Sequence, residues 1–201
     1  MLKVGLTGGL ACGKTFVGEA LADLGCHLIQ ADELGHQVLL PTGEAYADVV
    51  REFGPGILSG DGTIDRKRLA MEVFGKPERL ETLNRLVHPH VFRREEELIG
   101  QFTRADPRGI VVVEAAILIE TGTYKNYDLL ILVECEEQQQ IERSLKRDHA
   151  DRAEVLARLR RQMPMAEKRK FVQYVIDTSG SKEDTLRRVR EVYDALRRIE
   201  V

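Results

Sequence analysis

Tryptophan is absent from this sequence of 201 residues, and aromatic residues as a whole make up only 5% of it. So few aromatic rings argue against a stacking platform for single-stranded nucleic acid. Apolar runs are short as well, and none approaches the roughly 20 residues that a membrane-spanning helix needs. The first residues lack a signal-peptide pattern, because Gly5 interrupts the apolar stretch and no cleavage region follows. We therefore expect no nucleic-acid partner and no membrane partner.

Cysteine is also scarce. Cys12, Cys26 and Cys135 are scattered and odd in number, which is typical of a reducing cytoplasm and argues against a disulfide framework or a structural zinc site. A chain of this length buries roughly 70% of its unfolded surface and needs neither device to hold a core. We expect one cytoplasmic globular domain over residues 1–201, as a monomer or a weak homo-oligomer.

Short apolar runs alternate with segments of helical spacing. The runs are rich in β-branched residues or leucine and are bounded by Gly, Asp, Asn or Glu, as buried strands are. Strands separated by helices predict an α/β fold of three layers, with a five-stranded parallel sheet and helices on both faces. The expected strands are residues 3–6, 27–30, 110–113, 129–133 and 174–176, and the expected helices are residues 15–24, 80–102, 138–146 and 181–199.

Residues 35–74 interrupt this alternation. They are rich in turn-forming residues and contain only short helical pieces, such as residues 66–74. The stretch has the character of an insertion after the second strand. Two interpretations are open: a subdomain that grips a substrate, or a surface excursion without function.

A phosphate-binding motif follows the first expected strand directly. The pattern G-x-x-x-x-G-K-[ST] places Gly-rich backbone before a helix, so that successive N–H groups and the positive helix end converge on phosphate oxygens. Lys14 can reach the β- and γ-phosphates, and the Thr15 hydroxyl can join the shell of Mg²⁺. The motif predicts a nucleotide site formed by Gly8, Gly9, Leu10, Ala11, Cys12, Gly13, Lys14 and Thr15.

Cys12 within this motif allows two interpretations. A helix N-terminus tends to lower the pKa of a thiol, and an oxidised Cys12 would obstruct the phosphate loop. The simpler interpretation, which we favour, is a small side chain that fits the loop.

The phosphate loop alone does not distinguish kinases from GTPases. Residues 32–35 match the D-x-x-G switch of GTPases, but no N-K-x-D guanine motif occurs anywhere in the sequence. Asp32 follows the second expected strand, where ligands of open α/β sheets bind. Its carboxylate is suited to accept the proton of an acceptor hydroxyl or to orient that hydroxyl. The alternative is that Asp32 caps the next helix.

The formal net charge of −3 hides an uneven distribution. Residues 143–170 contain ten Lys or Arg against four Asp or Glu, so this segment carries +6 and the rest of the chain −9. Such a block is consistent with a solvated helix face, a nucleic-acid patch or a site for a small polyanion. Arg143, Lys146 and Arg147 share one helical face and are suited to stabilise a transferring phosphoryl group.

Residues 149–152 follow that face directly. We interpret them as a hinge or part of a mobile lid that spans about residues 143–165.

The sequence resembles the dephospho-coenzyme A kinase family over nearly its whole length. Several independent motifs in the same order carry the resemblance. They are Gly5-Leu6-Thr7-Gly8-Gly9 with the phosphate loop, Ala31-Asp32, Gly60-Asp61-Gly62-Thr63-Ile64-Asp65-Arg66 with Phe74, His88-Pro89, Ile141-Glu142-Arg143, Arg147-Asp148, Arg161-Gln162-Met163, Val175-Ile176-Asp177 and Ser179-Gly180.

The resemblance implies ATP-dependent phosphorylation of the ribose 3′-hydroxyl of dephospho-coenzyme A, the final step of coenzyme A synthesis. It implies an acceptor-binding subdomain at about residues 35–105. Asp32 would be the base or orienting carboxylate, and Lys14 and Arg143 would stabilise phosphate charge. The other implied positions are Arg147 in the lid over the nucleotide, Asp177 and Gly180 near the adenine, and Arg66, His88 and Pro89 on the acceptor side.

The sequence departs from the family pattern at several positions. Gln30 stands where an Asp is common, Ala116 replaces a Pro two positions after the acidic Glu114, and Thr178 replaces an Asn. Glu114 is one methylene longer than Asp and can still reach Mg²⁺ through water. The expected metal ligands are therefore Thr15 and Glu114.

His88 and His90 flank Pro89 and invite the idea of a metal site. No third ligand has suitable spacing, so we favour a packing or acceptor-binding role.

Two other hypotheses remain for the function of the whole chain. One is a kinase for nucleoside monophosphates or another small metabolite. The other is a nucleotide-dependent regulator that binds nucleic acid through residues 143–170. The latter is disfavoured because acids are interleaved with the positive charges and the remaining chain is acidic.

Overall fold

The computed structural model describes residues 1–148 and 151–199, and the chain divides into two units. The first unit comprises Met1–Gln30 and the chain from Phe102 onward, and the second comprises Ala31–Gln101. Within the described residues no helix is both long and apolar enough to cross a bilayer.

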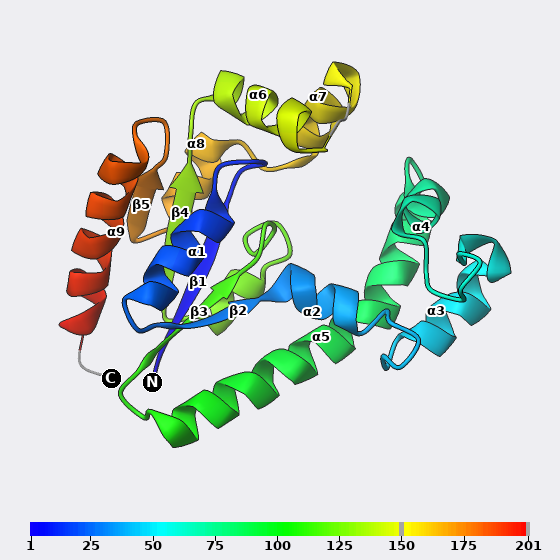
Figure 1. Cartoon of the computed structure of the whole chain (residues 1–201), viewed down its shortest axis with the longest axis horizontal. Helices are drawn as coiled ribbons and strands as arrows, with labels where there is room; N and C mark the ends of the chain where they lie inside the picture. Colours follow the sequence, from blue (N-terminus) through cyan, green and yellow to red (C-terminus); the bar gives the residue numbers. More distant parts are fainter. Residues whose placement is uncertain (149–150, 200–201) are drawn as a thin grey trace. The chain divides into compact units, whose positions relative to one another are not determined.

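The first unit is built on the predicted five-stranded parallel sheet (Figure 1). Every expected strand is present, with bounds that differ by at most two residues at either end. The strand order is β2-β3-β1-β4-β5. The strands are β1 (Leu2–Gly8), β2 (His27–Gln30), β3 (Ile110–Glu114), β4 (Leu129–Glu134) and β5 (Tyr174–Asp177).

Register places the carboxyl ends of the strands along one edge of the sheet. Gly8 pairs with Val133, and Glu134 pairs with Asp177. Loops that leave this edge are where open parallel sheets hold ligands.

Helices α1 (Lys14–Asp23) and α9 (Lys182–Arg197) pack side by side against the sheet (Figure 1). Both follow expected helices, and each turns an apolar stripe toward the strands. The core that they share with the sheet consists of Leu2, Val4, Leu6, Cys12, Val17, Ala20, Leu21, Cys26, Ile110, Val112, Ile131, Val133, Ile176, Val189, Val192 and Leu196.

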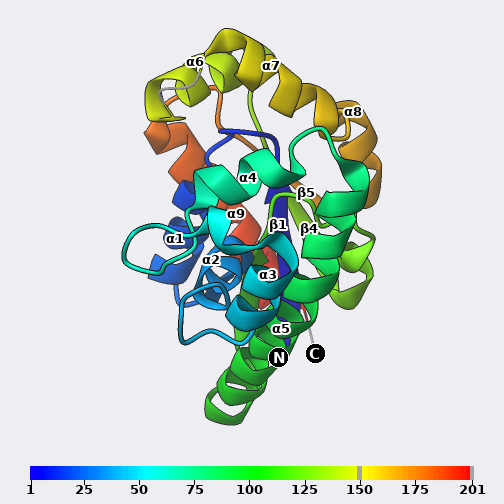
Figure 2. The ribbon, with the colours of Figure 1, turned by 90° about the vertical axis from the view of Figure 1, so that its right-hand side faces the viewer.

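Among the described residues between β4 and β5 there are three helices, and they follow one another across the top of Figure 2. They are α6 (Glu137–Asp148), α7 (Arg152–Arg161) and α8 (Met165–Lys168), followed by η3 (Arg169–Phe171). A further 3-10 turn, η2 (Thr123–Asn126), precedes β4.

The structure describes only part of the segment predicted as a hinge or mobile lid, residues 149–152. Residues 149 and 150 lie outside the described residues, but Asp151 is the N-cap of α7 and Arg152 is its first residue. The Asp151 side chain accepts a hydrogen bond from the Glu154 N–H, so this part of the segment is a capped helix start. Val155 of α7 is fully buried with Ile141 of α6 and Leu10 of the phosphate loop.

The second unit contains α2 (Ala31–Gln37), α3 (Tyr46–Phe53), η1 (Pro55–Ile57), α4 (Arg66–Val73) and most of α5 (Pro77–Ala105). The expected helix at residues 66–74 is present as α4, and α5 is longer than expected at both ends. α3 was not anticipated. Arg94 of α5 ties this helix to the turn before α3, since its guanidinium makes two hydrogen bonds to the Glu44 carboxylate, at 2.9 and 3.0 Å.

Candidate active site

The phosphate loop connects β1 to α1 with a sharply bent backbone. Gly13 has φ +81° and Ala11 has φ +53°, both in the left-handed region. Gly8 is needed for close approach, because a Cβ at this position would lie 2.2 Å from the Val133 carbonyl oxygen of β4. The predicted strand, loop and helix order around the motif is therefore confirmed, and the loop lies at the carboxyl end of β1.

Lys14 folds back over the loop from the first position of α1. Its Nζ donates a hydrogen bond to the Gly9 carbonyl oxygen at 3.0 Å and lies 3.5 Å from the Gly8 carbonyl oxygen. The ammonium group is thus held against the curl of the loop.

Thr15 and Glu114 meet at the same edge of the sheet. The Thr15 hydroxyl donates to Glu114 Oε1 at 3.0 Å, and the Gln30 amide donates to Glu114 Oε2 at 3.1 Å. Glu114 ends β3 and is only 9% exposed. Hydroxyl and carboxylate oxygens are the ligands that Mg²⁺ prefers, and Mg²⁺ usually takes few protein ligands beside water and phosphate. The two side chains therefore fit a magnesium ion.

Thr178 joins the phosphate loop to Arg143. Its hydroxyl donates to the Cys12 carbonyl oxygen at 2.8 Å, and its own oxygens accept hydrogen bonds from the Arg143 guanidinium at 2.8 and 3.1 Å. Thr178 follows β5 and is buried, whereas Arg143 projects from α6. The departure at Thr178 thus supplies a hydroxyl that fixes two predicted site elements against each other.

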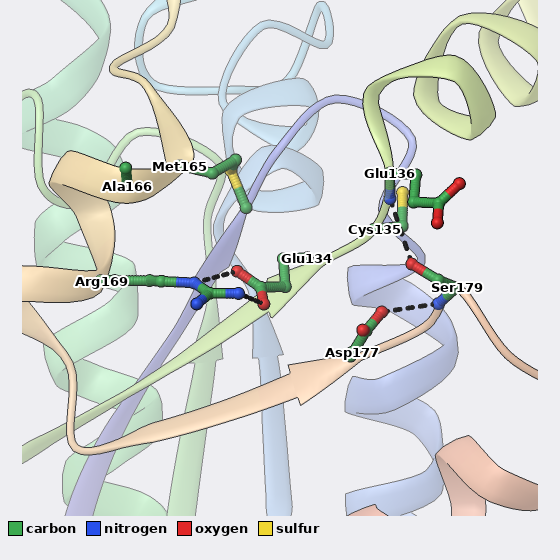
Figure 3. Close-up of a pocket in the computed structure, with 8 residues that line it drawn as sticks. All are labelled: Glu134, Cys135, Glu136, Met165, Ala166, Arg169, Asp177 and Ser179. Carbon is green, nitrogen blue, oxygen red and sulfur yellow. Dashed lines mark hydrogen bonds and ion pairs between the residues drawn. The ribbon is translucent and has the colours of Figure 1, made fainter.

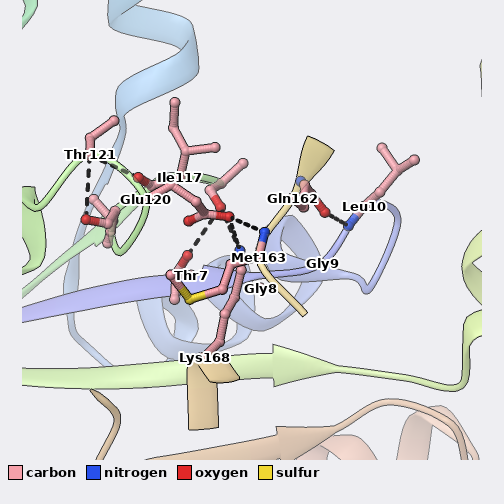
Figure 4. Close-up of polar contacts among 12 residues, drawn as sticks. Thr7, Gly8, Gly9, Leu10, Ile117, Glu120, Thr121, Gln162, Met163 and Lys168 are labelled. Carbon is pink, nitrogen blue, oxygen red and sulfur yellow. Dashed lines mark hydrogen bonds and ion pairs between the residues drawn. The ribbon is translucent and has the colours of Figure 1, made fainter. Parts of the chain in front are cut away.

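Gln162 reaches the phosphate loop from the end of α7 (Figure 4). Its side-chain oxygen accepts a hydrogen bond from the Leu10 N–H at 2.9 Å. The next residue, Met163, donates its N–H to Glu120 Oε1 at 3.1 Å. The end of the predicted lid segment is therefore anchored at both the loop and the chain after β3.

A buried ion pair supports this anchor. Lys168 is fully buried, and its Nζ lies 2.8 Å from Glu120 Oε1 and donates to the Ala116 carbonyl oxygen at 3.2 Å (Figure 4). The same carbonyl accepts a hydrogen bond from the Thr7 hydroxyl at 3.2 Å. Hydrogen bonds on both partners offset the cost of removing two charges from water.

The structure revises the interpretation of the basic segment. Lys168 is neutralised by Glu120, the Arg169 guanidinium pairs with the buried Glu134 carboxylate, and Lys170 pairs with Glu167. These three positive charges are partnered within the protein. The Arg143 guanidinium also has protein partners, and it lies beside the phosphate loop through Thr178.

A pocket of about 370 Å³ opens beside the carboxyl ends of β4 and β5 (Figure 3). Arg169 projects into it and holds Glu134, while the Ser179 hydroxyl accepts the Glu136 N–H at 3.1 Å. The lining residues are Glu134, Cys135, Glu136, Met165, Ala166, Arg169, Asp177 and Ser179.

The remaining predicted nucleotide residues lie on α6 and in the turn after β5. Arg147 is exposed in the last turn of α6. Asp177 ends β5, and its Oδ1 accepts the Ser179 N–H at 2.8 Å. Gly180 directly precedes Ser181, the N-cap of α9. The turn is bound to α6, because the Gln139 amide donates to the Ser179 carbonyl oxygen at 2.9 Å.

The predicted acceptor residues all belong to the second unit. Asp32 is the second residue of α2 and is exposed, so it is not an N-cap, and the capping alternative is wrong. Arg66 is the exposed first residue of α4, which Asp65 caps. Pro89 lies inside α5, whose helical assignment continues through it, and burial lowers the pKa of the neighbouring His88.

Some contacts at the site escaped prediction from the sequence. Gln162 occurs in a motif that carries the resemblance, but its bond to Leu10 depends on how α7 folds back. The sequence likewise gives no sign that Lys168 is buried, because its neighbours Glu167, Arg169 and Lys170 are all charged. A signal did exist for α3, since Val49 and Phe53 are buried at i, i+4 spacing.

Comparisons with known proteins point to one family. A family model described as dephospho-CoA kinase matches residues 2–184. The dephospho-CoA kinase of Aquifex aeolicus is 38% identical over 198 residues, which cover 98% of this chain and 99% of the relative.

Two solved structures have a similar architecture. A protein of Thermus thermophilus known from a crystal structure superposes with a TM-score of 0.82 at 31% identity, over 96% of each chain. The dephospho-CoA kinase of Campylobacter jejuni superposes with a TM-score of 0.64 at 23% identity, over 96% of each chain. The second likeness concerns the fold alone.

Proposed function

This chain belongs to the dephospho-CoA kinase family, which carries out the final, ATP-dependent step of coenzyme A synthesis, and we propose that it phosphorylates the ribose 3′-hydroxyl of dephospho-CoA. The products are coenzyme A and ADP. The observation that carries the proposal is the phosphate loop with Lys14 folded against it and Thr15 bonded to Glu114. A kinase for another nucleoside monophosphate or small metabolite would share this loop but not the match over residues 2–184.

The phosphate loop binds the triphosphate of ATP in this proposal. Backbone N–H groups between Gly8 and Thr15 donate to phosphate oxygens, and the N-terminal end of α1 adds its positive potential. Lys14 exchanges its bond to the Gly9 carbonyl for the β- and γ-phosphates. Phosphoryl transfer depends on positioning and charge stabilisation, which this loop provides.

Thr15 and Glu114 are the residues that would hold Mg²⁺. When bound there, Mg²⁺ would supply positive charge against the charge that develops on the phosphate oxygens. Glu114 orients the Thr15 hydroxyl through their 3.0 Å hydrogen bond, and Gln30 in turn orients Glu114.

Arg143 stabilises the charge of the transferring group from the side of α6. Its guanidinium is held by the Thr178 hydroxyl and carbonyl, and Thr178 is bonded to the phosphate loop. Arg147, one turn further along α6, contributes to a lid at about residues 143–165 that closes over the nucleotide. Asp177 and Gly180, in the turn after β5, contact the adenine end of ATP.

Asp32 acts on the acceptor. It lies two residues after β2 in the chain and is exposed, and its carboxylate makes no hydrogen bond or ion pair with the other described residues. Such a carboxylate is free to accept the proton of the ribose hydroxyl as the phosphoryl group arrives. Arg66, His88 and Pro89 bind other parts of dephospho-CoA within the acceptor-binding segment at about residues 35–105.

Exposed apolar side chains in the second unit support this acceptor role. Met71 of α4 is 66% exposed and Phe74, which follows α4, is 56% exposed. An apolar surface of this kind is suited to the hydrocarbon parts of a coenzyme A arm. A cytoplasmic location, and a monomer or weak homo-oligomer without nucleic-acid partners, complete the proposal.

The test offers the protein Mg²⁺, ATP and one acceptor at a time, and it measures ADP release. Dephospho-CoA, AMP and shikimate are the acceptors, and phosphorus NMR locates the new phosphate. We expect turnover with dephospho-CoA and a phosphate on the 3′-oxygen. Turnover with AMP or shikimate but not with dephospho-CoA would overturn the proposal.

A further inference from the structure

Two cysteines that are 123 residues apart in the sequence meet beside the phosphate loop. The Sγ atoms of Cys12 and Cys135 lie 3.4 Å apart, within hydrogen-bond distance for sulfur. Cys12 belongs to the phosphate loop, and Cys135 directly follows β4. The pairing of β1 with β4, which sets Gly8 opposite Val133, brings the two thiols together.

The two thiols differ in access to solvent. Cys12 is fully buried, whereas Cys135 is half-buried and lines the pocket of about 370 Å³ (Figure 3). A small oxidant can therefore enter the pocket and reach Cys135 first. Cys12 can react only with what forms on Cys135.

The electrostatic surroundings of the two thiols also favour reaction at Cys135. The hydrogen bond with Cys12 lowers the pKa of Cys135, and the positive charge of Arg143 lowers it further, against the effects of burial and of Asp177. The same bond and burial raise the pKa of Cys12. With both thiols protonated, Cys135 donates to Cys12. Once Cys135 loses its proton, which the nearby Arg143 favours, the Cys12 thiol becomes the donor and stabilises the Cys135 thiolate.

We propose that Cys135 and Cys12 form an oxidisable thiol pair, in which a hydroperoxide oxidises Cys135 and Cys12 then closes a disulfide. The Cys135 thiolate attacks the peroxide, the O–O bond breaks, and a sulfenic acid and one hydroxyl product form. The Cys12 sulfur then attacks the Cys135 sulfur, and water leaves. Two thiols lose two electrons and two protons in total, and the peroxide is reduced.

A disulfide would alter the nucleotide site that the proposed function assigns, and this consequence rests on that proposal. The bond requires a sulfur separation of about 2.05 Å, so the sulfurs must approach by about 1.3 Å from their 3.4 Å separation. The Cys12 carbonyl is already tied to Thr178 at 2.8 Å. Pulling Cys12 toward β4 therefore displaces backbone N–H groups of the phosphate loop, and we expect ATP affinity to fall by about tenfold or more.

The first experiment treats the whole protein with hydrogen peroxide and counts thiols before and after. We expect two of the three thiols to disappear, a peptide that links Cys12 to Cys135, and complete recovery with dithiothreitol. Cys135→Ser should abolish the loss of both thiols. Cys26→Ser is the matched control, because Cys26 is also buried but has its pKa raised to about 12, chiefly by burial, and it should leave the link intact.

The second experiment measures Mg-ATP binding by calorimetry in the oxidised and reduced protein. Weaker binding that dithiothreitol restores supports the proposal, and unchanged affinity of the cross-linked protein overturns its regulatory part. Loss of thiols without the Cys12–Cys135 peptide overturns the pair itself. Neither readout uses dephospho-CoA, so failure here is distinguishable from failure of the proposed kinase reaction.

Discussion

The Thr178 hydroxyl donates a 2.8 Å hydrogen bond to the carbonyl oxygen of Cys12. This one bond ties the turn after β5 to the phosphate loop, and Arg143 is fixed to the same threonine. The geometry of the phosphate loop and the position of the guanidinium are therefore coupled through a single side chain.

Thr178→Val should weaken ATP use with little change in shape, since it exchanges the hydroxyl for a methyl group. The loss leaves the buried Cys12 carbonyl without this donor, which costs about 1–3 kcal/mol of folding stability. Because the phosphate loop is then no longer tied to the threonine that holds Arg143, kcat/KM for ATP should fall by about tenfold or more. Thr178→Ser keeps the hydroxyl and should stay close to the parent protein. Equal rates for the two variants would show that the bond has no role in catalysis.

Glu114→Gln should raise the Mg²⁺ concentration needed for half-maximal activity. The variant removes negative charge next to the Thr15 hydroxyl, and changes around a metal site typically cost about 10–100-fold in metal affinity. A magnesium titration at saturating ATP measures the effect. Glu136→Gln, at an exposed position, is the control, and an unchanged titration for Glu114→Gln would argue against a metal role.

Lys168→Met should destabilise the protein by about 3 kcal/mol, because it leaves Glu120 without its buried partner. Chemical denaturation gives the free energy of unfolding. Adding Glu120→Gln should recover part of the loss, as expected for two residues in direct contact.

A matched control lies two residues away. Lys170 pairs with Glu167 on the surface, and Lys170→Met should change the free energy of unfolding by less than about 1 kcal/mol. Similar losses for Lys168→Met and Lys170→Met would contradict the distinction between the two pairs.

Alkylation by iodoacetamide should reveal different thiols at different pH. A lowered pKa moves the formation of thiolate to lower pH, so Cys135 should react at a pH where an ordinary cysteine, with a pKa of about 8.5, is still mostly protonated. Cys26, whose pKa burial raises to about 12, should react slowly throughout.

Arg143→Gln provides the check on the cause. It removes the positive charge that lowers the pKa of Cys135 and should shift the alkylation profile to higher pH. A profile that does not move would mean that Arg143 has no electrostatic effect on this thiol.

The sheet and the phosphate loop were predictable because their signals are local. Each strand is a short apolar run between turn residues, and the phosphate loop is a contiguous motif. α7 was missed because its apolar residues, Val155, Leu156 and Leu159, are few among many charges.

Contacts between distant segments could not be predicted in this way. The Cys12–Cys135 pair depends on β1 and β4 being neighbours in the sheet, and neither cysteine has a local signal for the other. The burial of Lys168 likewise depends on Glu120 from another segment. Asp32 illustrates a third case, because the alternative that it caps a helix requires the helix to begin after it, whereas α2 begins at Ala31.

The most direct test of the account is the kcat of Asp32→Asn with dephospho-CoA and saturating Mg-ATP, measured beside Glu33→Gln. Both carboxylates are exposed in the first turn of α2, and neither change alters side-chain size appreciably. We predict that Asp32→Asn lowers kcat by about 10²-fold or more while Glu33→Gln stays near the parent value. A near-normal kcat for Asp32→Asn would contradict the assignment of Asp32 as the carboxylate that acts on the acceptor hydroxyl.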